Sequence, residues 1–475
     1  MGGVKLPAPD PMAMVIFGAS GDLTRRKLIP ALYHLFVEGL LSEPFRVVGY
    51  ARSQMSNEEF REFAHEAAIE FCRCKVEGER WDEFATRLSY VSGEFTDPGA
   101  FAHLRRHLDR FDETHGTSGR RFYYCSTPPV AYPDIVRRVG EEKMAAGTRI
   151  VIEKPFGENL ESARELNEIV HEVFDEDQVY RIDHYLGKET VQNILAFRFA
   201  NAMWEPIWNR RYVDHVQLTV AEEIGIEGRG RFYERTGAIR DMVQTHLFQT
   251  LTFLAMEPPP AFEPGQLLDE KVKVLRAIRP LEKGSLVRGQ YEGYRDEEDV
   301  APDSEVETFA ALRLEIDNWR WAGVPFFLRT GKRLEEKRAE ATVQFKDVPH
   351  QMFERAGIED VEPNRLTLRI QPDEGISLSF AVQRPGYGLD LHEASLRFDY
   401  GEAFKTPLVE AYELLLLEAM GGDHTLFTRE DGVERSWELL DSVLASPPPV
   451  APYEAGSWGP KEADDLIAPR PWYLC

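Results

Sequence analysis

The stretch MAMVIFGASGDL, residues 12–23, decides the fold of the first part of this chain. Met12–Phe17 is a continuous apolar run, which is typical of a strand that is buried in a parallel sheet. The turn Gly18-x-x-Gly21 follows, and apolar side chains then recur at helical spacing. Strand, glycine turn and helix in this order are the context of a dinucleotide pyrophosphate site. Because the full Gly-x-Gly-x-x-Gly spacing is missing, an ordinary tight turn is the alternative.

The second expected strand, Phe45–Tyr50, indicates which dinucleotide such a site would bind. An NAD site usually has Asp or Glu at the end of this strand, where the carboxylate holds the ribose hydroxyls. Here Ala51-Arg52 follows instead, and an arginine suits the 2′-phosphate of NADP. A surface arginine without a ligand is the alternative.

Strand and helix signals alternate from there to about residue 180. Further strands are expected over 88–91, 122–125 and 149–152, and helices over 56–71, 98–110, 132–146 and 160–174. Ser56 is expected to cap the first of these helices. This alternation predicts a doubly wound, Rossmann-like α/β domain. Ligands bind beyond the carboxyl ends of such strands, so Lys154, which follows the strand over 149–152, can reach a cofactor or substrate.

The nonapeptide RIDHYLGKE, residues 181–189, gathers a carboxylate, an imidazole, a phenol and an ammonium. If it opens a helix, His184 and Lys188 lie one turn apart on one face, next to backbone N–H groups at the positive end of the helix dipole. Two cations at a helix N-terminus make an anion site that fits phosphate. Asp183 would point elsewhere and could orient another group. A charged, solvated helix start is the alternative.

After about residue 210 the pattern changes to long strands with alternating apolar residues, interrupted by helical stretches over 236–256, 408–420 and 436–444. We therefore expect an NADP-binding domain over 1–183 and a larger α+β domain with a mainly antiparallel sheet over 184–475. The second domain would bind substrate. Its sheet, with one free face, could join a homodimer or homotetramer.

Charge and cysteine content exclude several classes of function. The chain has 56 Lys and Arg against 81 Asp and Glu, a net charge of −25, which argues against a nucleic-acid or anionic-membrane partner. No apolar run reaches the length of a membrane span, and the N-terminus lacks the pattern of a signal peptide. The four cysteines, Cys72, Cys74, Cys125 and Cys475, are too few and too scattered for a disulfide framework or a four-ligand zinc site. We expect a cytoplasmic protein without a metal.

Several motifs together resemble the glucose-6-phosphate 1-dehydrogenase family. They lie at residues 18–28, 153–157, 181–189, 221–223, 241–246, 323–326 and 329–334, and the likeness extends from about Met14 to Pro460. The resemblance implies oxidation of glucose 6-phosphate at C1 to 6-phosphogluconolactone, with hydride transfer to NADP. This is the first oxidative step of the pentose phosphate pathway. Some family members also use NAD, so NAD is a possible second cofactor.

The resemblance also assigns site residues. His246 matches the base that removes the hydroxyl proton, and Asp183 matches the carboxylate that orients it. Substrate-binding roles fall on His184, Tyr185, Lys188, Glu222, Asp241, Lys332 and Lys337. Cofactor-binding roles fall on Gly18, Ser20, Gly21, Asp22, Leu23, Lys27, Arg52 and Lys154. On an ideal α-helix, Asp241 and His246 would lie about 140° apart and flank the sugar from different sides.

Two other functions remain open at this point. Glu-Lys-Pro after a Rossmann strand is also similar to the glucose–fructose oxidoreductase and inositol dehydrogenase group of sugar and polyol dehydrogenases, in which the lysine is catalytic. The expected anion site at His184 and Lys188 argues against that group. The second is an NADP-binding sensor without activity, but such a protein should have lost its base or its orienting carboxylate. Both Asp183 and His246 are present.

Overall fold

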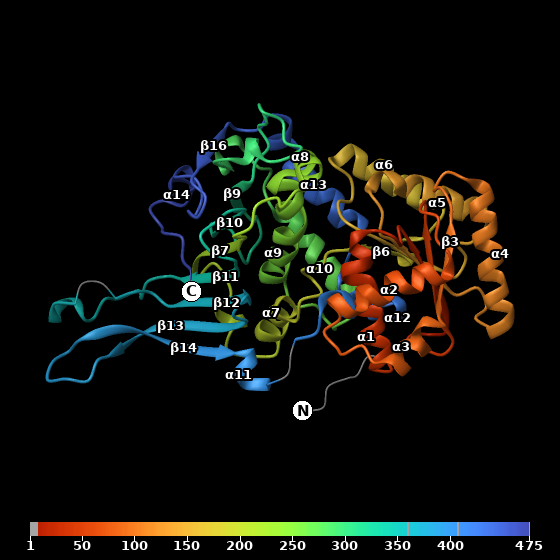
Figure 1. Cartoon of the computed structure of the whole chain (residues 1–475). Helices are drawn as coiled ribbons and strands as arrows, with labels where there is room; N and C mark the ends of the chain where they lie inside the picture. Colours follow the sequence, from red (N-terminus) through yellow and green to blue (C-terminus); the bar gives the residue numbers. More distant parts are fainter. Residues whose placement is uncertain (1–7, 359–360, 406–407, 475) are drawn as a thin grey trace. The chain divides into compact units, whose positions relative to one another are not determined.

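The computed structural model describes residues 8–358, 361–405 and 408–474, and the chain divides into two compact units. Unit 1 consists of Met1–Lys188, Ala261–Leu268 and Val409–Glu434, and unit 2 of Glu189–Pro260, Asp269–Leu408 and Arg435–Cys475. Each unit is built around its own β-sheet (Figure 1). In the part of the chain that the structure describes, no helix is both long and apolar enough to span a membrane.

The sheet of unit 1 confirms the predicted doubly wound α/β fold. Its strand order is β15-β6-β5-β4-β1-β2-β3. The parallel strands are β1 (Met12–Phe17), β2 (Phe45–Ala51), β3 (Leu88–Ser92), β4 (Arg121–Cys125), β5 (Arg149–Ile152) and β6 (Val179–Ile182). A two-residue strand, β15 (Phe427–Thr428), pairs antiparallel with β6 at the edge. Because β1 lies between β2 and β4, the chain reverses its direction across the sheet beside the glycine turn.

Helices cover both faces of this sheet. They are α1 (Ile29–Val37), α2 (Asn57–Phe71), α3 (Gly78–Ala85), α4 (Pro98–His115), α5 (Tyr132–Glu141), α6 (Leu160–His171) and α12 (Ala411–Gly421). One face carries α1 with α2, α3 and α12, and the other carries α4, α5 and α6 (Figure 1). As predicted, Ser56 caps α2: its hydroxyl accepts a hydrogen bond from the Glu59 N–H, and the Glu59 carboxylate accepts one from the Ser56 N–H.

The helix that was considered for residues 184–188 does not form. Asp183–Gly187 is a series of turns, and α7 (Glu189–Phe199) begins only after Lys188. The condition under which His184 and Lys188 would lie one helical turn apart is therefore not met. The Asp183 carboxylate accepts a hydrogen bond from the Tyr185 N–H at 2.9 Å, a local bond that competes with helix formation. Gly187 also disfavours a helix.

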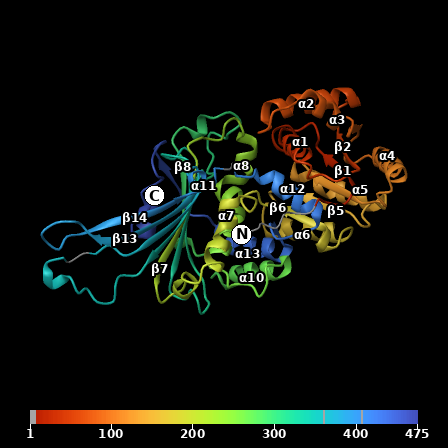
Figure 2. The same cartoon turned by 90° about the horizontal axis from the view of Figure 1, so that it is seen from below.

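The sheet of unit 2 has the strand order β14-β13-β12-β11-β7-β10-β9-β8-β16. Its strands are β7 (Val213–Ala221), β8 (Leu286–Tyr291), β9 (Phe309–Glu315), β10 (Pro325–Gly331), β11 (Arg338–Phe345), β12 (Arg365–Gln371), β13 (Gly375–Gln383), β14 (Leu391–Asp399) and β16 (Val450–Tyr453). Only the pairs β7–β10 and β8–β16 are parallel among these nine, so the predicted mainly antiparallel sheet is confirmed. Figure 2 shows β13 and β14 at one edge.

The helices associated with unit 2 are α7, α8 (Gly230–Ala238), η5 (Ile239–Leu247), α9 (Phe248–Ala255), α11 (Tyr400–Phe404) and α14 (Glu462–Ile467), together with most of α10 (Pro264–Ala277) and α13 (Glu430–Ala445). The single helix expected over 236–256 is broken at Gly237, whose φ is +60°, and its middle part, η5, is a π-helix. The side chain and backbone carbonyl of Glu307 accept hydrogen bonds from the N–H groups of Ile239 and Ala238. The buried Glu307 therefore caps the start of η5.

Candidate active site

The glycine turn of unit 1 has the close backbone packing that a dinucleotide site requires. Gly18 has a φ of +85°, and a Cβ atom there would lie 2.1 Å from the carbonyl oxygen of Ser126. The Gly18 N–H donates a hydrogen bond to the Tyr50 carbonyl oxygen at 2.8 Å. The Gly21 N–H donates one to the Gly18 carbonyl oxygen at 2.9 Å. Only glycine fits at residue 18, so β1, β2 and β4 can bring their carboxyl ends together.

The side chains beside this turn fit the phosphates of NADP. The hydroxyl of Ser20 lies 3.2 Å from that of Ser53, which joins the turn to the end of β2. Arg52 is exposed, and among the described residues it makes no ion pair, so its guanidinium is available to an anionic ligand. An uncompensated arginine at this strand end matches the chemistry of a 2′-phosphate.

Asp22, Leu23 and Lys27 follow the turn on the first helical residues, where Thr24–Leu28 forms a π-helical segment. Asp22 accepts a hydrogen bond from Arg26 at 2.7 Å. The ammonium of Lys27 lies 2.9 Å from a carboxylate oxygen of Glu410, which precedes α12. No local sequence pattern indicates this partner, because 383 residues separate the two side chains.

The strand end before Lys154 is held by a buried carboxylate that sequence reasoning missed. Glu153 accepts a hydrogen bond from the Tyr124 hydroxyl at 2.5 Å, and its backbone carbonyl accepts one from Tyr132 at 3.1 Å. Burial raises the pKa of Glu153, while the hydroxyls of Tyr124 and Tyr412 and the neighbouring Lys154 oppose that shift. The network fixes the backbone from which Lys154 extends.

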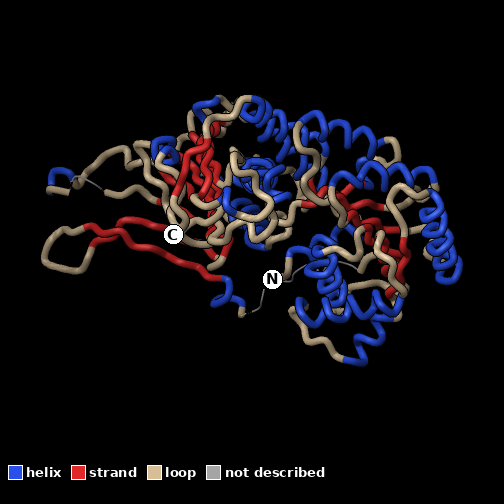
Figure 3. The backbone as a smooth tube through the Cα atoms, turned by 45° about the horizontal axis from the view of Figure 1, so that its top comes forward, coloured by secondary structure: helices blue, strands red, loops and turns tan. Residues whose placement is uncertain are grey.

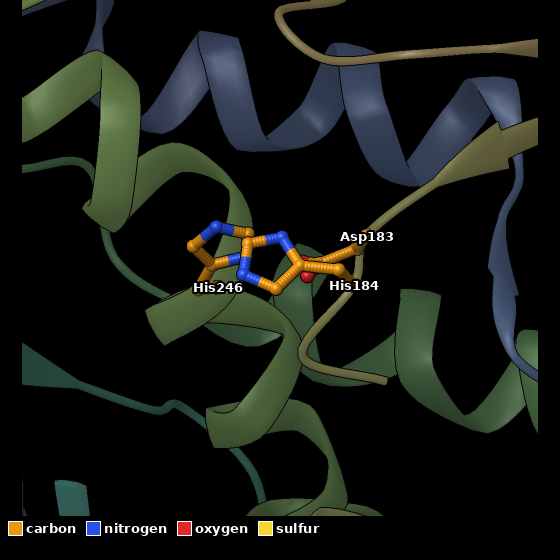
Figure 4. Close-up of side chains that lie close together, drawn as sticks. All are labelled: Asp183, His184 and His246. Carbon is orange, nitrogen blue, oxygen red and sulfur yellow. The ribbon is translucent and has the colours of Figure 1, made fainter. Parts of the chain in front are cut away.

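Asp183 and His184 lie where the chain leaves β6 (Figure 4). Asp183 is 2% exposed, and the Tyr185 N–H holds one of its carboxylate oxygens. The Lys188 ammonium lies 4.0 Å from the centroid of the Tyr185 ring, and the His184 and Tyr185 ring centroids are 5.2 Å apart. These four predicted site residues are therefore brought together by turns rather than by a helix.

In unit 2 the structure joins two of the predicted sugar-binding residues. Lys332 follows β10, is 3% exposed, and forms a short ion pair with Glu222, which follows β7. Because β7 and β10 are parallel neighbours, their carboxyl ends meet at one edge. The Lys332 ammonium also faces the ring of Tyr233 at 5.4 Å, and its backbone carbonyl accepts a hydrogen bond from Tyr453 at 2.6 Å. Lys337, by contrast, is exposed just before β11.

Asp241 and His246 both lie on the π-helix η5. Figure 4 shows His246 on this helix. In a π-helix each N–H pairs with the carbonyl five residues earlier, so residues five apart lie close to one face. The 140° separation expected for an α-helix therefore does not apply. His246 is fully buried, whereas Asp241 is half-buried. Burial raises the pKa of Tyr233 well above its usual range, and the nearby carboxylates Asp241 and Glu222 add to that shift.

Comparisons with known proteins agree along the whole chain. A family model described as "Glucose-6-phosphate dehydrogenase, NAD binding domain" matches residues 15–193, and one described as "Glucose-6-phosphate dehydrogenase, C-terminal domain" matches residues 195–473. The glucose-6-phosphate 1-dehydrogenase of Chlamydia pneumoniae is 45% identical over 98% of this chain and 96% of that protein.

Two solved structures are similar over the same length. The glucose-6-phosphate 1-dehydrogenase from Mycobacterium avium has a TM-score of 0.89 and 38% identity, over 98% of this chain and 100% of that one. A glucose-6-phosphate dehydrogenase in complex with its substrate glucose-6-phosphate has a TM-score of 0.90 and 35% identity, over 99% and 100%. The chain therefore belongs to the glucose-6-phosphate dehydrogenase family.

Proposed function

We propose that this protein oxidises D-glucose 6-phosphate at C1 to 6-phospho-D-glucono-1,5-lactone, with NADP as the hydride acceptor and NAD as a possible second cofactor. The observation that carries the proposal is the likeness, over nearly the full length of both chains, to a glucose-6-phosphate dehydrogenase bound to its substrate. The reaction is that of an oxidoreductase acting on a CH–OH group. Curated relatives at about 45% identity favour it over a sugar or polyol dehydrogenase of another group and over a sensor without activity.

The cofactor is assigned to the carboxyl edge of the unit 1 sheet. The glycine turn at Gly18 and Gly21 admits the pyrophosphate, and Ser20 and Arg52 bind the 2′-phosphate. Lys154 extends from the strand end that Glu153 anchors. Bound NADP supplies a nicotinamide ring that accepts a hydride.

His246 is assigned as the base and Asp183 as the carboxylate that orients it. Hydride leaves C1 more readily as the hydroxyl loses its proton, so an imidazole nitrogen of His246 takes that proton. The Asp183 carboxylate stabilises the resulting imidazolium. The burial of both side chains supports this assignment, because exclusion of water strengthens their electrostatic attraction. The Tyr185 N–H supports it as well, since it fixes the direction of the carboxylate.

The substrate phosphate is assigned to His184, Tyr185 and Lys188, and the sugar to Glu222, Asp241, Lys332 and Lys337. The Lys332–Glu222 ion pair supports the sugar assignment. It places a carboxylate against the buried ammonium and leaves the second carboxylate oxygen of Glu222 for a sugar hydroxyl.

We further propose that residues 1–183 bind the cofactor, and that residues 184–475 bind the substrate and form a homodimer or homotetramer through the sheet of unit 2. A cytoplasmic location is also proposed. The free thiols of Cys72, Cys74 and Cys125 support it, because such thiols persist in a reducing compartment. Cys475 lies outside the described residues.

The activity is tested by following nicotinamide absorbance with glucose 6-phosphate or glucose, and with NADP or NAD. With NADP as cofactor, we expect the kcat/KM for glucose 6-phosphate to be at least about a hundredfold above that for glucose. Glucose has no phosphate group for the cationic site to bind. Comparable turnover of the two sugars would instead support the other group of sugar dehydrogenases.

The base is tested with His246→Asn, which keeps a polar side chain of similar shape but removes a titratable group. We expect kcat to fall by a factor of about 10³ or more while the Kd for glucose 6-phosphate changes little. His215→Asn is the matched control, because His215 is also buried in unit 2 but outside the assigned site. A His246→Asn protein with near-normal kcat would disprove the assignment.

A further inference from the structure

A cavity of about 340 Å³ in unit 1 plays no part in the proposed function. Its apolar walls are Pro264 and Leu268, from the first turns of α10, and Phe427, from β15. None of its described lining residues is assigned to the cofactor or to glucose 6-phosphate. Its volume lies in the range of about 300–1,000 Å³ that is typical of pockets for small molecules.

One wall of the cavity is a packed group of three aromatic rings. The His424 ring is stacked on the Tyr180 ring at 4.0 Å between centroids, and Phe427 meets Tyr180 edge-on at 4.9 Å. Tyr180 is fully buried in β6. The hydroxyl of Thr428 donates a hydrogen bond to the Arg181 carbonyl oxygen at 3.3 Å, which adds to the pairing of β15 with β6. This wall is therefore preformed.

His424 presents a hydrogen-bond acceptor that the protein does not use. Its Nε2 atom is buried and has no hydrogen-bond partner in the part of the chain that the structure describes. Burial lowers the pKa of His424, so the ring is neutral near pH 7 and carries one proton. The backbone of Gly422 also bonds to this ring, and that contact must involve Nδ1. The proton therefore belongs on Nδ1, and Nε2 can accept a hydrogen bond from a ligand.

The charged side chains around the cavity leave one negative charge uncompensated. Glu176 forms an ion pair with Arg181 at 2.7 Å, and Arg429 forms one with Asp431 at 2.8 Å. Asp177, in the short helix η3 (Glu176–Gln178), is exposed and makes no ion pair with any residue that the structure describes. A carboxylate and a neutral imidazole acceptor on an apolar cavity are complementary to a group that is positively charged and only donates hydrogen bonds.

We propose that this cavity binds a small organic cation, a primary amine joined to an apolar body about the size of one ring. The ammonium group donates hydrogen bonds to the Asp177 carboxylate and to Nε2 of His424. The apolar body packs between Pro264, Leu268 and Phe427. Because the cavity shares no described lining residue with the assigned active site, binding does not compete with glucose 6-phosphate or NADP.

Three probes of similar shape but different charge test this site in the full chain near pH 7. They are 2-phenylethylamine, which is a cation, 2-phenylethanol, which is neutral, and 3-phenylpropionate, which is an anion. Titrations followed by ligand-observed NMR should give a Kd of about 1 mM or lower for the amine and at least about tenfold higher for the alcohol. The anion should not bind. Saturating glucose 6-phosphate and NADP should leave the Kd of the amine unchanged.

Two substitutions test the polar contacts. Asp177→Asn should raise the Kd of the amine by at least about fivefold and leave that of the alcohol unchanged, because only the amine pairs with the carboxylate. His424→Phe keeps an aromatic ring against Tyr180 but removes Nε2, and should also weaken binding of the amine. Glu172→Gln is the matched control. It removes an exposed carboxylate of the same unit that does not line the cavity, and the Kd should not change.

Leu268→Trp tests the position of the apolar body, because the larger side chain fills the cavity and should abolish binding of the amine. An unchanged Tm and kcat show that this variant is folded; if it is not, Asp177→Asn, on an exposed residue, decides. The proposal would be overturned by no saturable binding of the amine up to about 10 mM, or by equal affinities for the amine and the alcohol. Competition by glucose 6-phosphate would also overturn it, since the amine would then occupy the assigned active site. A protein that binds the amine but does not oxidise glucose 6-phosphate would contradict the proposed function alone.

Discussion

The cationic side chains of Lys332 and Arg52 differ in how their positive charges are compensated. Lys332 is almost fully buried, and its ammonium is compensated by Glu222. A buried cation without such a partner would cost several kcal/mol, so the burial of Lys332 depends on this ion pair. Arg52 is exposed and makes no ion pair with any described residue. Its guanidinium can therefore pair with a bound anion.

The Arg52→Ala substitution should therefore separate the two cofactors. We expect the KM for NADP to rise by about tenfold or more, because one charge-assisted contact with the 2′-phosphate is lost. The KM for NAD, which has no such phosphate, should change by less than twofold. Steady-state kinetics with each cofactor at saturating glucose 6-phosphate measure both values. Equal increases in KM for the two cofactors would show that Arg52 does not bind the 2′-phosphate.

The pKa of Glu418 gives a pH-dependent prediction. Burial, and to a smaller extent the negative charge of Asp423, raises this pKa to about 7. The folded state therefore keeps a proton that the unfolded state loses, and stability falls as the pH rises from the usual range of a glutamate toward 7. Glu418→Gln cannot ionise and should be more stable than the parent at pH 8, by about 1–3 kcal/mol.

Thermal unfolding of the parent and of Glu418→Gln at pH 5 and pH 8 tests this predicted change of stability with pH. The difference in Tm should be clearly larger at pH 8. Glu66→Gln, on the exposed face of α2, is the control and should show no such change between the two pH values. A Glu418→Gln protein that gains nothing at pH 8 would contradict the prediction.

Among the helices, two π-helical segments stand out because each carries proposed site residues. Thr24–Leu28 contains Lys27, and η5 contains Asp241 and His246. A π-helix is rare, and the π-helical turns found in proteins are frequently at functional sites. In η5 it brings two residues that are five apart close to one face. The sequence pattern could not show this, because apolar periodicity does not distinguish the two helix types over nine residues.

The start of η5 depends on Gly237 and can be tested there. A Cβ atom at Gly237 would lie 2.4 Å from a carboxylate oxygen of Glu307, the residue that caps η5, and its φ of +60° already disfavours other residues. Gly237→Ala should therefore lower the Tm and reduce kcat by at least about tenfold, because it displaces the helix that carries His246.

Gly228→Ala is the matched control for this change. Gly228 also has a positive φ, of +73°, but a Cβ atom there would meet nothing within 4 Å. The free energy of unfolding should fall by only about 1 kcal/mol, which is the cost of the strained backbone, and kcat should not change. If the two variants lose the same Tm and both keep full kcat, the cap at Gly237 does not position the catalytic helix.

On the scale of the whole chain, a long hairpin of unit 2 is the best candidate for a subunit interface. Strands β13 and β14 form the edge of the sheet, joined by a loop at the tip of the hairpin (Figure 3). Leu396 on β14 is 62% exposed, and Phe404 on the following helix is also 62% exposed. An unpaired edge strand with exposed apolar side chains is unfavourable in a monomer and is typical of a surface that another subunit covers.

The oligomer is tested by sedimentation velocity. The parent chain of 54.4 kDa should sediment as a dimer or tetramer. Leu396→Glu should shift it toward the monomer, because a charge would be buried in the interface. Trp319→Ser is the control, since Trp319 is 95% exposed but lies before β10, away from the hairpin. A parent that is monomeric at micromolar concentration, or a Leu396→Glu protein of unchanged mass, would contradict the proposal.

Local sequence determined most of unit 1. The run Met12–Phe17 corresponds to β1 without any shift, and the start of β2 and the Ser56 cap were also found. These features depend on neighbouring residues: apolar runs form buried strands, glycine permits a positive φ, and a serine hydroxyl reaches an N–H three residues later. The motifs at 18–28, 153–157 and 181–189 likewise sufficed to indicate the family.

The tertiary structure alone decided the rest. Residues 409–434 return to unit 1, where Glu410 meets Lys27, and no local pattern predicts a contact across 383 residues. The Lys332–Glu222 pair arises because β7 and β10 are parallel neighbours, and the turns over 183–187 replace a helix because the Asp183 side chain binds a nearby N–H. Sequence periodicity records which face of an element is apolar. The partners of a charged side chain are set by packing between elements that are distant in the chain.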